Sequence, residues 1–254
     1  MLARLLDGRA LAAGLGLLAL VALLAWGASP YGRYLSHAYE PASVSGQAGA
    51  IAFFLGGWLL MTTAMMLPTA SGLLRTFDRV TRARPERERT RLRLALVAGF
   101  LSVWLLVGYL LRSGDVAVHL AVDSSGWLAA HTALIAAGAL AVAGAFQFSD
   151  LKHRCLTACR TPRAFVVAGW RGGRPHADAL RIGIAYGRSC VGCCWALMLV
   201  MFAAGSANLA LMLGLAAVMA GERVAPPALA RRLGHGVGAL LLGLAALLAA
   251  TAFV

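Results

Sequence analysis

Long stretches without a charged side chain are the feature of this sequence that most constrains its fold. The main ones lie between Arg9 and Arg33, Glu40 and Arg75, Arg93 and Arg112, Asp123 and Asp150, and Arg188 and Glu222. A last apolar run extends from Gly236 to Val254. A membrane-spanning helix needs about 20 predominantly apolar residues, so each stretch can hold at least one helix. The stretch that ends at Glu222 is divided by a Gly-Ser-Ala-Asn turn at 205–208 and can hold two.

We therefore predict an all-α fold, a polytopic membrane helical bundle of about seven transmembrane helices in a single domain over residues 1–254. The expected spans are roughly 10–28, 49–70, 93–112, 127–148, 181–204, 208–223 and 234–253. The sixth is short, so it either tilts or forms a re-entrant hairpin with the fifth. Only 13% of the residues are charged, against about 25% in an average soluble domain, which supports a membrane location.

The positive charges predict the orientation of these helices. If the N-terminus is cytoplasmic, 21 of the 23 Lys and Arg residues fall in cytoplasmic segments, and only Arg33 and Arg112 lie outside. Because cytoplasmic segments are enriched in Lys and Arg, we predict a cytoplasmic N-terminus and an external C-terminus. Residues 149–181 then form a cysteine-bearing cytoplasmic loop, and the expected location is a bacterial inner membrane. The run Ala10–Trp26 follows a basic start, as in a signal peptide, and we interpret it as a retained first helix.

The net charge of +13 does not indicate a nucleic-acid partner. Its arginines lie in the predicted cytoplasmic loops, where they would contact anionic lipid of the bilayer. A nucleic-acid surface would interleave aromatic and basic side chains, and Phe77 is the single aromatic residue between Arg75 and Arg93. The sequence also contains neither a Ser/His/Asp arrangement nor an HExxH motif, so we do not expect an enzyme.

Sulfur is concentrated in three of the predicted helices. Seven of the eight methionines and three of the five cysteines lie in the second, fifth and sixth spans. These residues are Met61, Met65 and Met66 in the second span, Cys190, Cys193, Cys194, Met198 and Met201 in the fifth, and Met212 and Met219 in the sixth. Methionine used as core filler would be spread more evenly over the helices. Thioethers and thiolates are soft ligands that favour Cu(I), with zinc as the alternative for the thiolates.

The helical spacing groups these sulfurs further. At 100° per residue, Cys190, Cys194, Met198 and Met201 fall on one side of their helix, which gives a sulfur-lined track of roughly 16 Å. Glu222 ends the sixth span and is either a metal ligand or a residue at the water interface. In the predicted cytoplasmic loop, Cys155 and Cys159 are one turn apart if that segment is helical. These two cysteines would exchange metal with a cytoplasmic carrier.

Two of these segments resemble a known family. Met61-Thr-Thr-Ala-Met65-Met66-Leu-Pro68 and Cys190-Val-Gly-Cys193-Cys194-Trp195-Ala-Leu-Met198 are similar to the two signature segments of the DUF2182 family of predicted metal-binding integral membrane proteins. The turn at 205–208 with Met212, the Glu222 position and the cysteine-bearing loop also match, so the resemblance covers about residues 55–225. It implies metal binding and leaves the task of the protein open.

Our main hypothesis is Cu(I) transport or delivery through the Met/Cys site on the second, fifth and sixth spans. The three cysteines at 190–194 would anchor the ion, with Met65, Met66 and Met219 as weaker partners and the remaining methionines as an exchange track. A first alternative is an accessory subunit of a membrane complex, such as a copper enzyme, whose contact faces are Gly183-xxx-Gly187 and Gly234-xxx-Gly238. A second alternative is a thiol–disulfide relay that uses Cys190 and Cys193 with the loop cysteines.

Overall fold

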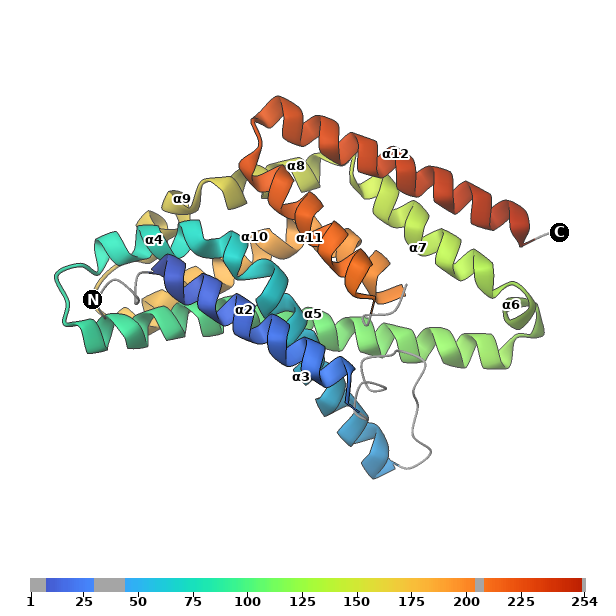
Figure 1. The fold of residues 1–254 in the computed structure, drawn as a ribbon, viewed down its shortest axis with the longest axis horizontal. Coiled ribbons are helices and arrows are strands. Elements are labelled where there is room, and N and C mark those ends of the chain that lie inside the picture. Colours follow the sequence, from blue (N-terminus) through green and yellow to red (C-terminus); the bar gives the residue numbers. More distant parts are fainter. Residues whose placement is uncertain (1–7, 30–43, 204–207, 253–254) are drawn as a thin grey trace.

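The computed structural model describes residues 8–29, 44–203 and 208–252, and within these ranges it contains helices and no strands (Figure 1). In chain order the helices are α2 (Gly8–Gly27), α3 (Val44–Met66), the short 3-10 helix η2 (Pro68–Ala70), α4 (Ser71–Val80), α5 (Glu86–Ser124), α6 (Gly126–Ala130), α7 (Thr132–Phe146), α8 (Asp150–Arg160), α9 (Pro162–Gly169), α10 (Pro175–Ala203), α11 (Leu209–Val224) and α12 (Pro227–Thr251). The all-α prediction is confirmed. Residues 205–207 of the predicted turn lie outside the described ranges; its last residue, Asn208, caps α11 by accepting a hydrogen bond from the Leu211 amide at 3.0 Å.

Five of the described helices are long and apolar enough to cross a membrane: α2, α3, α5, α10 and α12. A sixth span results if α7 and α8, which meet at a bend of 63°, are counted together. The remaining helix of the predicted seven, α11, has 16 residues, and α7 alone has 15, so both are shorter than the roughly 20 residues of a full span. A membrane-helical bundle with five or six candidate spans is therefore shown, and the number seven stays a prediction.

Helix α5 is much longer than the predicted span at 93–112, because it begins at Glu86 and continues to Ser124. Its extra turns carry charged side chains that pair along the helix. Arg112 donates to Asp115 at 2.7 Å, and His119 Nδ1 lies 3.5 Å from the same carboxylate. Pairs three and four residues apart stabilise a helix, so the charges that mark the end of the apolar stretch do not end the helix.

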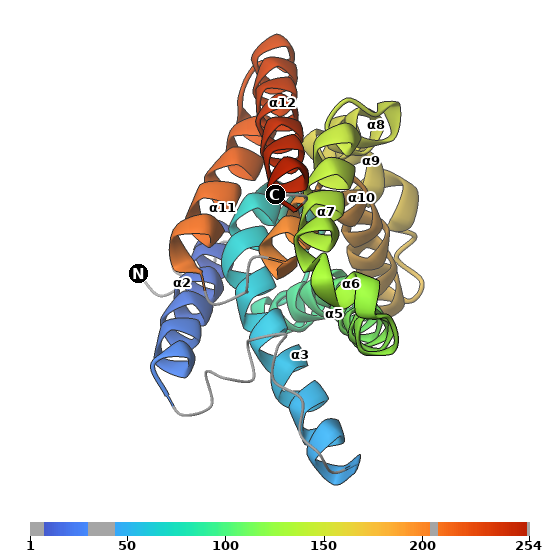
Figure 2. The same ribbon diagram turned by 90° about the vertical axis from the view of Figure 1, so that its right-hand side faces the viewer.

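Small residues bring the central helices close together. A Cβ atom on Gly183 of α10 would collide with the Leu96 carbonyl oxygen of α5. A Cβ on Gly238 of α12 would lie 2.8 Å from Gln147 Cβ, just beyond α7, and Figure 2 shows α7 and α12 running side by side. The two glycine faces that the accessory-subunit alternative assigned to contacts with a partner therefore contact helices of the same chain, which corrects that part of the alternative.

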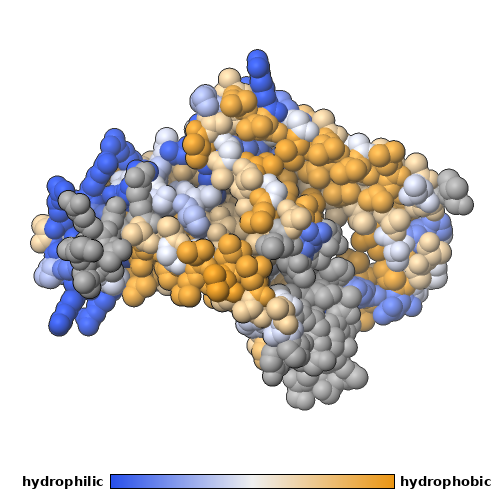
Figure 3. All heavy atoms as spheres, in the orientation of Figure 1, coloured by the Kyte–Doolittle hydropathy of each residue, from blue (hydrophilic) through white to orange (hydrophobic). Residues whose placement is uncertain are grey.

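The arginine-rich segments gather at one end of the molecule. Phe77 of α4 packs edge-on against Trp170, which follows α9, with ring centroids 5.3 Å apart, and Arg84 lies 5.7 Å from the centre of the Trp170 ring. Figure 3 shows hydrophilic residues at this end and hydrophobic residues over α2 and α12. The predicted loops around Arg84 and Trp170 thus lie on the same side of the bundle, as the charge asymmetry requires. Which side of the membrane this is stays a prediction.

Candidate metal centre: a buried sulfur cluster beside Arg223

Helix α8 folds back along α10 and adds a cysteine to those of α10. The Tyr186 hydroxyl donates to the Cys159 carbonyl at 3.1 Å, and the Ser189 hydroxyl donates to the Cys155 carbonyl at 3.1 Å. Gly192 permits this approach, because a Cβ there would lie 2.5 Å from Cys155 Sγ. The two loop cysteines do lie one turn apart on a helix, and α8 is packed against the span that carries the other three.

Four of the five thiols form a buried cluster. Cys159, Cys190, Cys193 and Cys194 are at most 4% exposed, whereas Cys155 is half-buried. The sulfurs of Cys159 and Cys193 are 4.0 Å apart, although these residues lie 34 positions apart in the sequence. The thiols of Cys193 and Cys194 both donate to the Cys190 carbonyl, at 3.1 Å and 2.8 Å. We call Cys159, Cys190, Cys193 and Cys194 the thiol cluster.

A guanidinium group contacts the thiol cluster directly. Arg223, near the end of α11, donates from Nη2 to Cys190 Sγ at 2.8 Å, and the same nitrogen lies 4.0 Å from Cys193 Sγ. Its Nη1 donates to the Thr69 hydroxyl at 2.5 Å, and that hydroxyl donates to the Met66 carbonyl at 2.7 Å. A positive charge next to a sulfur favours the thiolate, which is the form that binds metal. Arg223 was not among the predicted ligands, because in the sequence it stands out only as a loop charge.

All seven predicted methionine ligands are buried in the same hydrophobic core as the thiol cluster. Met198 and Met201 are fully buried on α10, further along the helix from the cysteines. Met65 of α3 and Met212 of α11 line one cavity of about 280 Å³, and Thr69 lines it too. Met61, Met66 and Met219 are no more than 3% exposed. The structure thus places Met65 and Met212 at the same cavity. Thr69, which also lines this cavity, accepts a hydrogen bond from Arg223, and Arg223 in turn contacts Cys190 of the thiol cluster.

Glu222 is engaged elsewhere. Its carboxylate is paired with Lys152 of α8, whose ammonium also donates to the Gln147 side chain, and both charged residues are buried. A buried ion pair of this kind holds α8 against the end of α11, a structural role that the sequence analysis did not anticipate. Lys152 is the single lysine of the chain, and this was the feature of the sequence that could have drawn attention to it.

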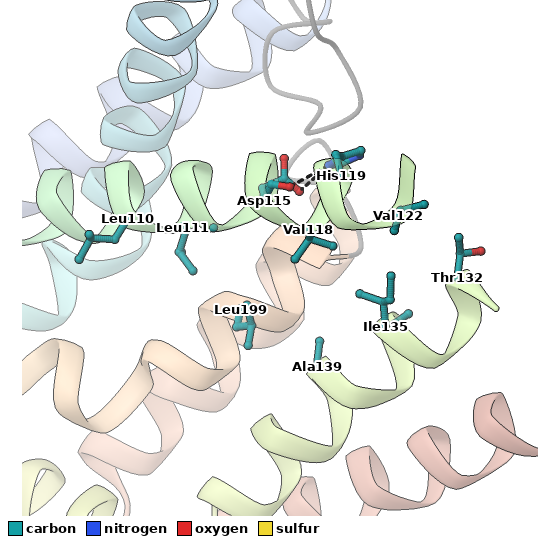
Figure 4. A pocket seen from close by; sticks show the side chains of 12 residues that line it. Leu110, Leu111, Asp115, Val118, His119, Val122, Thr132, Ile135, Ala139 and Leu199 are labelled. Carbon is teal, nitrogen blue, oxygen red and sulfur yellow. Dashed lines mark hydrogen bonds and ion pairs between the residues drawn. The ribbon is translucent and has the colours of Figure 1, made fainter. Parts of the chain in front are cut away.

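A second cavity, of about 540 Å³, lies between α5 and α7 (Figure 4). Leucine, valine, isoleucine and alanine side chains line most of it, and Asp115 and His119 lie at its α5 wall. Leu199 of α10 also lines it, and none of the described residues that line it carries sulfur. The cavity is therefore separate from the thiol cluster.

In the part of the chain that the structure describes, no three His, Cys, Asp or Glu side chains are already arranged around a common metal position. The hydrogen bonds explain this, because Cys193 and Cys194 point their thiols at a backbone carbonyl. Metal binding would require these thiols to rotate towards one another.

The fold and the cluster define a helical membrane protein with a buried, cation-flanked group of thiols. Comparison with known families gives a more specific assignment. The family model PpoB2, described as a copper chaperone, matches residues 55–248, and the chain belongs to this family. No curated protein and no solved structure matches the chain. A copper-related family agrees with the metal-binding prediction, and the thiol cluster, Arg223 and all seven buried methionines lie within the matched residues.

Proposed function

We propose that this protein binds Cu(I) at the thiol cluster and passes the ion to a recipient in or beyond the membrane. One observation carries the proposal: buried cysteines from α8 and α10 lie together beside the guanidinium of Arg223. The chain that contains them belongs to a copper-chaperone family. Thiolates are the protein ligands that select Cu(I), and the resemblance to the DUF2182 family supports the same metal-binding role. The function is ligand exchange without a chemical change in the ion, so no enzymatic step is proposed.

The charges of the cluster suit a monovalent ion. Two thiolates and one Cu(I) carry a net charge of −1, and the guanidinium of Arg223, 2.8 Å from Cys190 Sγ, compensates it. An uncompensated charge in a buried site costs several kcal/mol. A divalent ion such as zinc with two thiolates is already neutral, so Arg223 would leave an excess positive charge. With two thiolates, the charge balance therefore favours Cu(I) over zinc.

The spacing of the sulfurs is close to that of a metal site. The Sγ atoms of Cys159 and Cys193 are 4.0 Å apart. If both bound one ion through metal–thiolate bonds of about 2.3 Å, the S–metal–S angle would be roughly 120°. This angle suits a three-sulfur site, and Cys190 or Cys194 is the natural third ligand after its thiol rotates. With two of the three sulfurs bound as thiolates and one as the neutral thiol, the net charge of the Cu(I) site stays at −1. The four cysteines provide one more thiol than such a site needs, so an ion can move from one set of three to another.

The methionines provide a route away from the thiols. Thioethers are neutral and bind Cu(I) more weakly than thiolates, so they can pass on the ion without trapping it. We propose that Met198, Met201 and Met212 form this exchange track, with Met65 opposite Met212 in their shared cavity. Met61, Met66 and Met219 remain candidates for accessory ligands, and Glu222 is assigned to its ion pair with Lys152.

The copper content of the purified full-length protein tests the binding site. The double variant Cys190→Ser/Cys193→Ser should lose the bound Cu(I), because it removes the two thiols that lie nearest to Arg223. Cys155→Ser is the matched control, since Cys155 lies outside the cluster, and it should keep the copper. Equal copper content in both variants would contradict the proposal.

Replacement of Met198, Met201 and Met212 by Leu tests the track. This change preserves volume and apolarity and should cost less than about 1.5 kcal/mol in packing at each position. The triple variant should keep the copper stoichiometry of the wild type but deliver less copper to cellular recipients. Unchanged delivery would favour the alternative of a static metal site in an accessory subunit.

A further inference from the structure

An arginine-lined cavity opens beside the thiol cluster. It has a volume of about 680 Å³ and lies between η2, α4, α8, α9 and the end of α11. Five arginines line it, and no carboxylate from the described part of the chain does. These are Arg75, Arg79, Arg160, Arg163 and Arg223. Cavities of roughly 300–1,000 Å³ hold small-molecule ligands, so this one can hold a molecule of the size of a short peptide.

The cavity leads to the sulfur atoms. Cys159 is the cysteine that lines it, and Cys159 Sγ lies 4.0 Å from Cys193 Sγ behind it. Arg223 lines the cavity and also contacts Cys190, so it borders both the cavity and the thiol cluster. A ligand in the cavity would therefore meet Cys159 before any other thiol.

The arginines point to a negatively charged ligand. Arg160 is occupied by carbonyl groups, those of Glu222, at 3.0 Å, and Ala225. Arg75, Arg79 and Arg163 also line the cavity, and guanidinium groups form strong charge-assisted hydrogen bonds with carboxylates.

From this cavity we infer that the protein receives Cu(I) as a small anionic thiol complex, in which the ion is held by thiolates of molecules that also carry carboxylates. This inference rests on the proposed Cu(I) binding and adds the chemical class of the molecule that donates the ion. A cavity of this size suits a small complex, whereas a protein donor would need a broad docking surface. The arginines would bind the carboxylates and place the copper beside Cys159.

The transfer is a thiol exchange. A Cu–S bond to Cys159 forms, one Cu–S bond to the carrier breaks, and the proton of the Cys159 thiol goes to the departing carrier thiolate. The ion stays Cu(I), so neither an oxidant nor a reductant is needed. A second exchange of the same kind, with Cys193 as the incoming thiol, would move the ion into the cluster.

The test compares transfer to full-length protein from two carriers. One is Cu(I)–glutathione, whose thiol molecules carry carboxylates, and the other is Cu(I) held by 2-mercaptoethanol, a thiol without a carboxylate. The cavity variant is the triple Arg75→Gln/Arg79→Gln/Arg163→Gln, which leaves Arg160 and Arg223 in place. The matched control is Arg82→Gln/Arg87→Gln/Arg91→Gln. These three arginines are exposed at the same arginine-rich end of the molecule and do not line the cavity, and their replacement removes the same amount of charge.

We expect the cavity variant to accept copper from Cu(I)–glutathione about tenfold more slowly than the wild type, since a cleft of one charge sign raises association rates by 10-fold or more. Its rate of transfer from the carrier without carboxylates, and both transfer rates of the control variant, should stay within about twofold of the wild-type rates. Equal losses in the two triple variants, or no loss in the cavity variant, would overturn the inference. A wild type that takes copper from neither carrier would instead overturn the proposed function.

Discussion

Arg223 Nη2 lies 2.8 Å from Cys190 Sγ, and this contact joins the last turn of α11 to the centre of α10. The other terminal nitrogen of the same guanidinium reaches Thr69, in η2. One side chain therefore holds three segments together at the thiol cluster. A lysine could provide the charge but not both contacts, because its single ammonium lacks the planar, forked geometry of the guanidinium.

Replacement of Arg223 by Gln should weaken Cu(I) binding. A hydrogen bond to a charged group contributes about 1.5–3 kcal/mol, so the Cu(I) dissociation constant should rise roughly tenfold to a hundredfold. Arg223→Lys should give an intermediate value, since it keeps the charge. Competition with a chromophoric Cu(I) chelator measures these constants. Tighter binding in Arg223→Gln would mean that the guanidinium competes with the ion, which contradicts the charge argument.

Thiol labelling distinguishes metal binding from a disulfide relay. In copper-loaded protein, Cys190 and Cys193 should resist alkylation, and removal of Cu(I) with a chelator should increase their labelling. Cys155, which is half-buried and outside the cluster, should label equally in both states. A relay predicts instead that oxidation protects the thiols and that a disulfide between Cys159 and Cys193 can be isolated. That outcome would replace the copper proposal.

The buried pair between Lys152 and Glu222 should stabilise the fold rather than bind metal. Lys152→Met leaves an unpaired buried carboxylate and should destabilise the protein by about 3–5 kcal/mol, measured as a loss of thermal stability in detergent. The double variant Lys152→Met/Glu222→Gln removes both charges and should recover most of that loss. It should also keep the wild-type copper content. Loss of copper in a stable double variant would restore Glu222 as a ligand.

The orientation of the bundle can be read with reporter fusions. A reporter at residue 83, in the arginine-rich loop before α5, should be cytoplasmic, and one at residue 119, near the far end of α5, should be external. The opposite result would place the arginine-lined cavity on the outer face of the membrane. The thiol exchange proposed above would then lose its reducing environment.

The sequence predicts the helical fold well because long uncharged stretches are a strong signal of membrane helices. It predicts the ends less well, as in α5, where Arg112 and Asp115 pair along the helix instead of ending it. By contrast, the sequence already predicts a short sixth helix at 208–223, and α11 extends from Leu209 to Val224.

The candidate site is predictable only in part. The cysteines at 190–194 are close in sequence, so helical spacing alone groups them. Cys159 joins them because α8 folds back against α10, and no local pattern encodes that contact. Arg223 was missed for the same reason, since its partner Cys190 lies 33 residues away. The neighbouring charges Glu222 and Arg223 after a long apolar stretch were the available clue.

The most direct test of the central claim is X-ray absorption at the copper edge of the Cu(I)-loaded full-length protein. The account predicts coordination by sulfur alone, with Cu–S distances near the usual metal–thiolate length of about 2.3 Å. It also predicts that this signal is lost in Cys190→Ser/Cys193→Ser and unchanged in Cys155→Ser. Nitrogen or oxygen ligands in the wild type, or an unchanged sulfur signal in the double variant, would contradict a Cu(I) site in the thiol cluster.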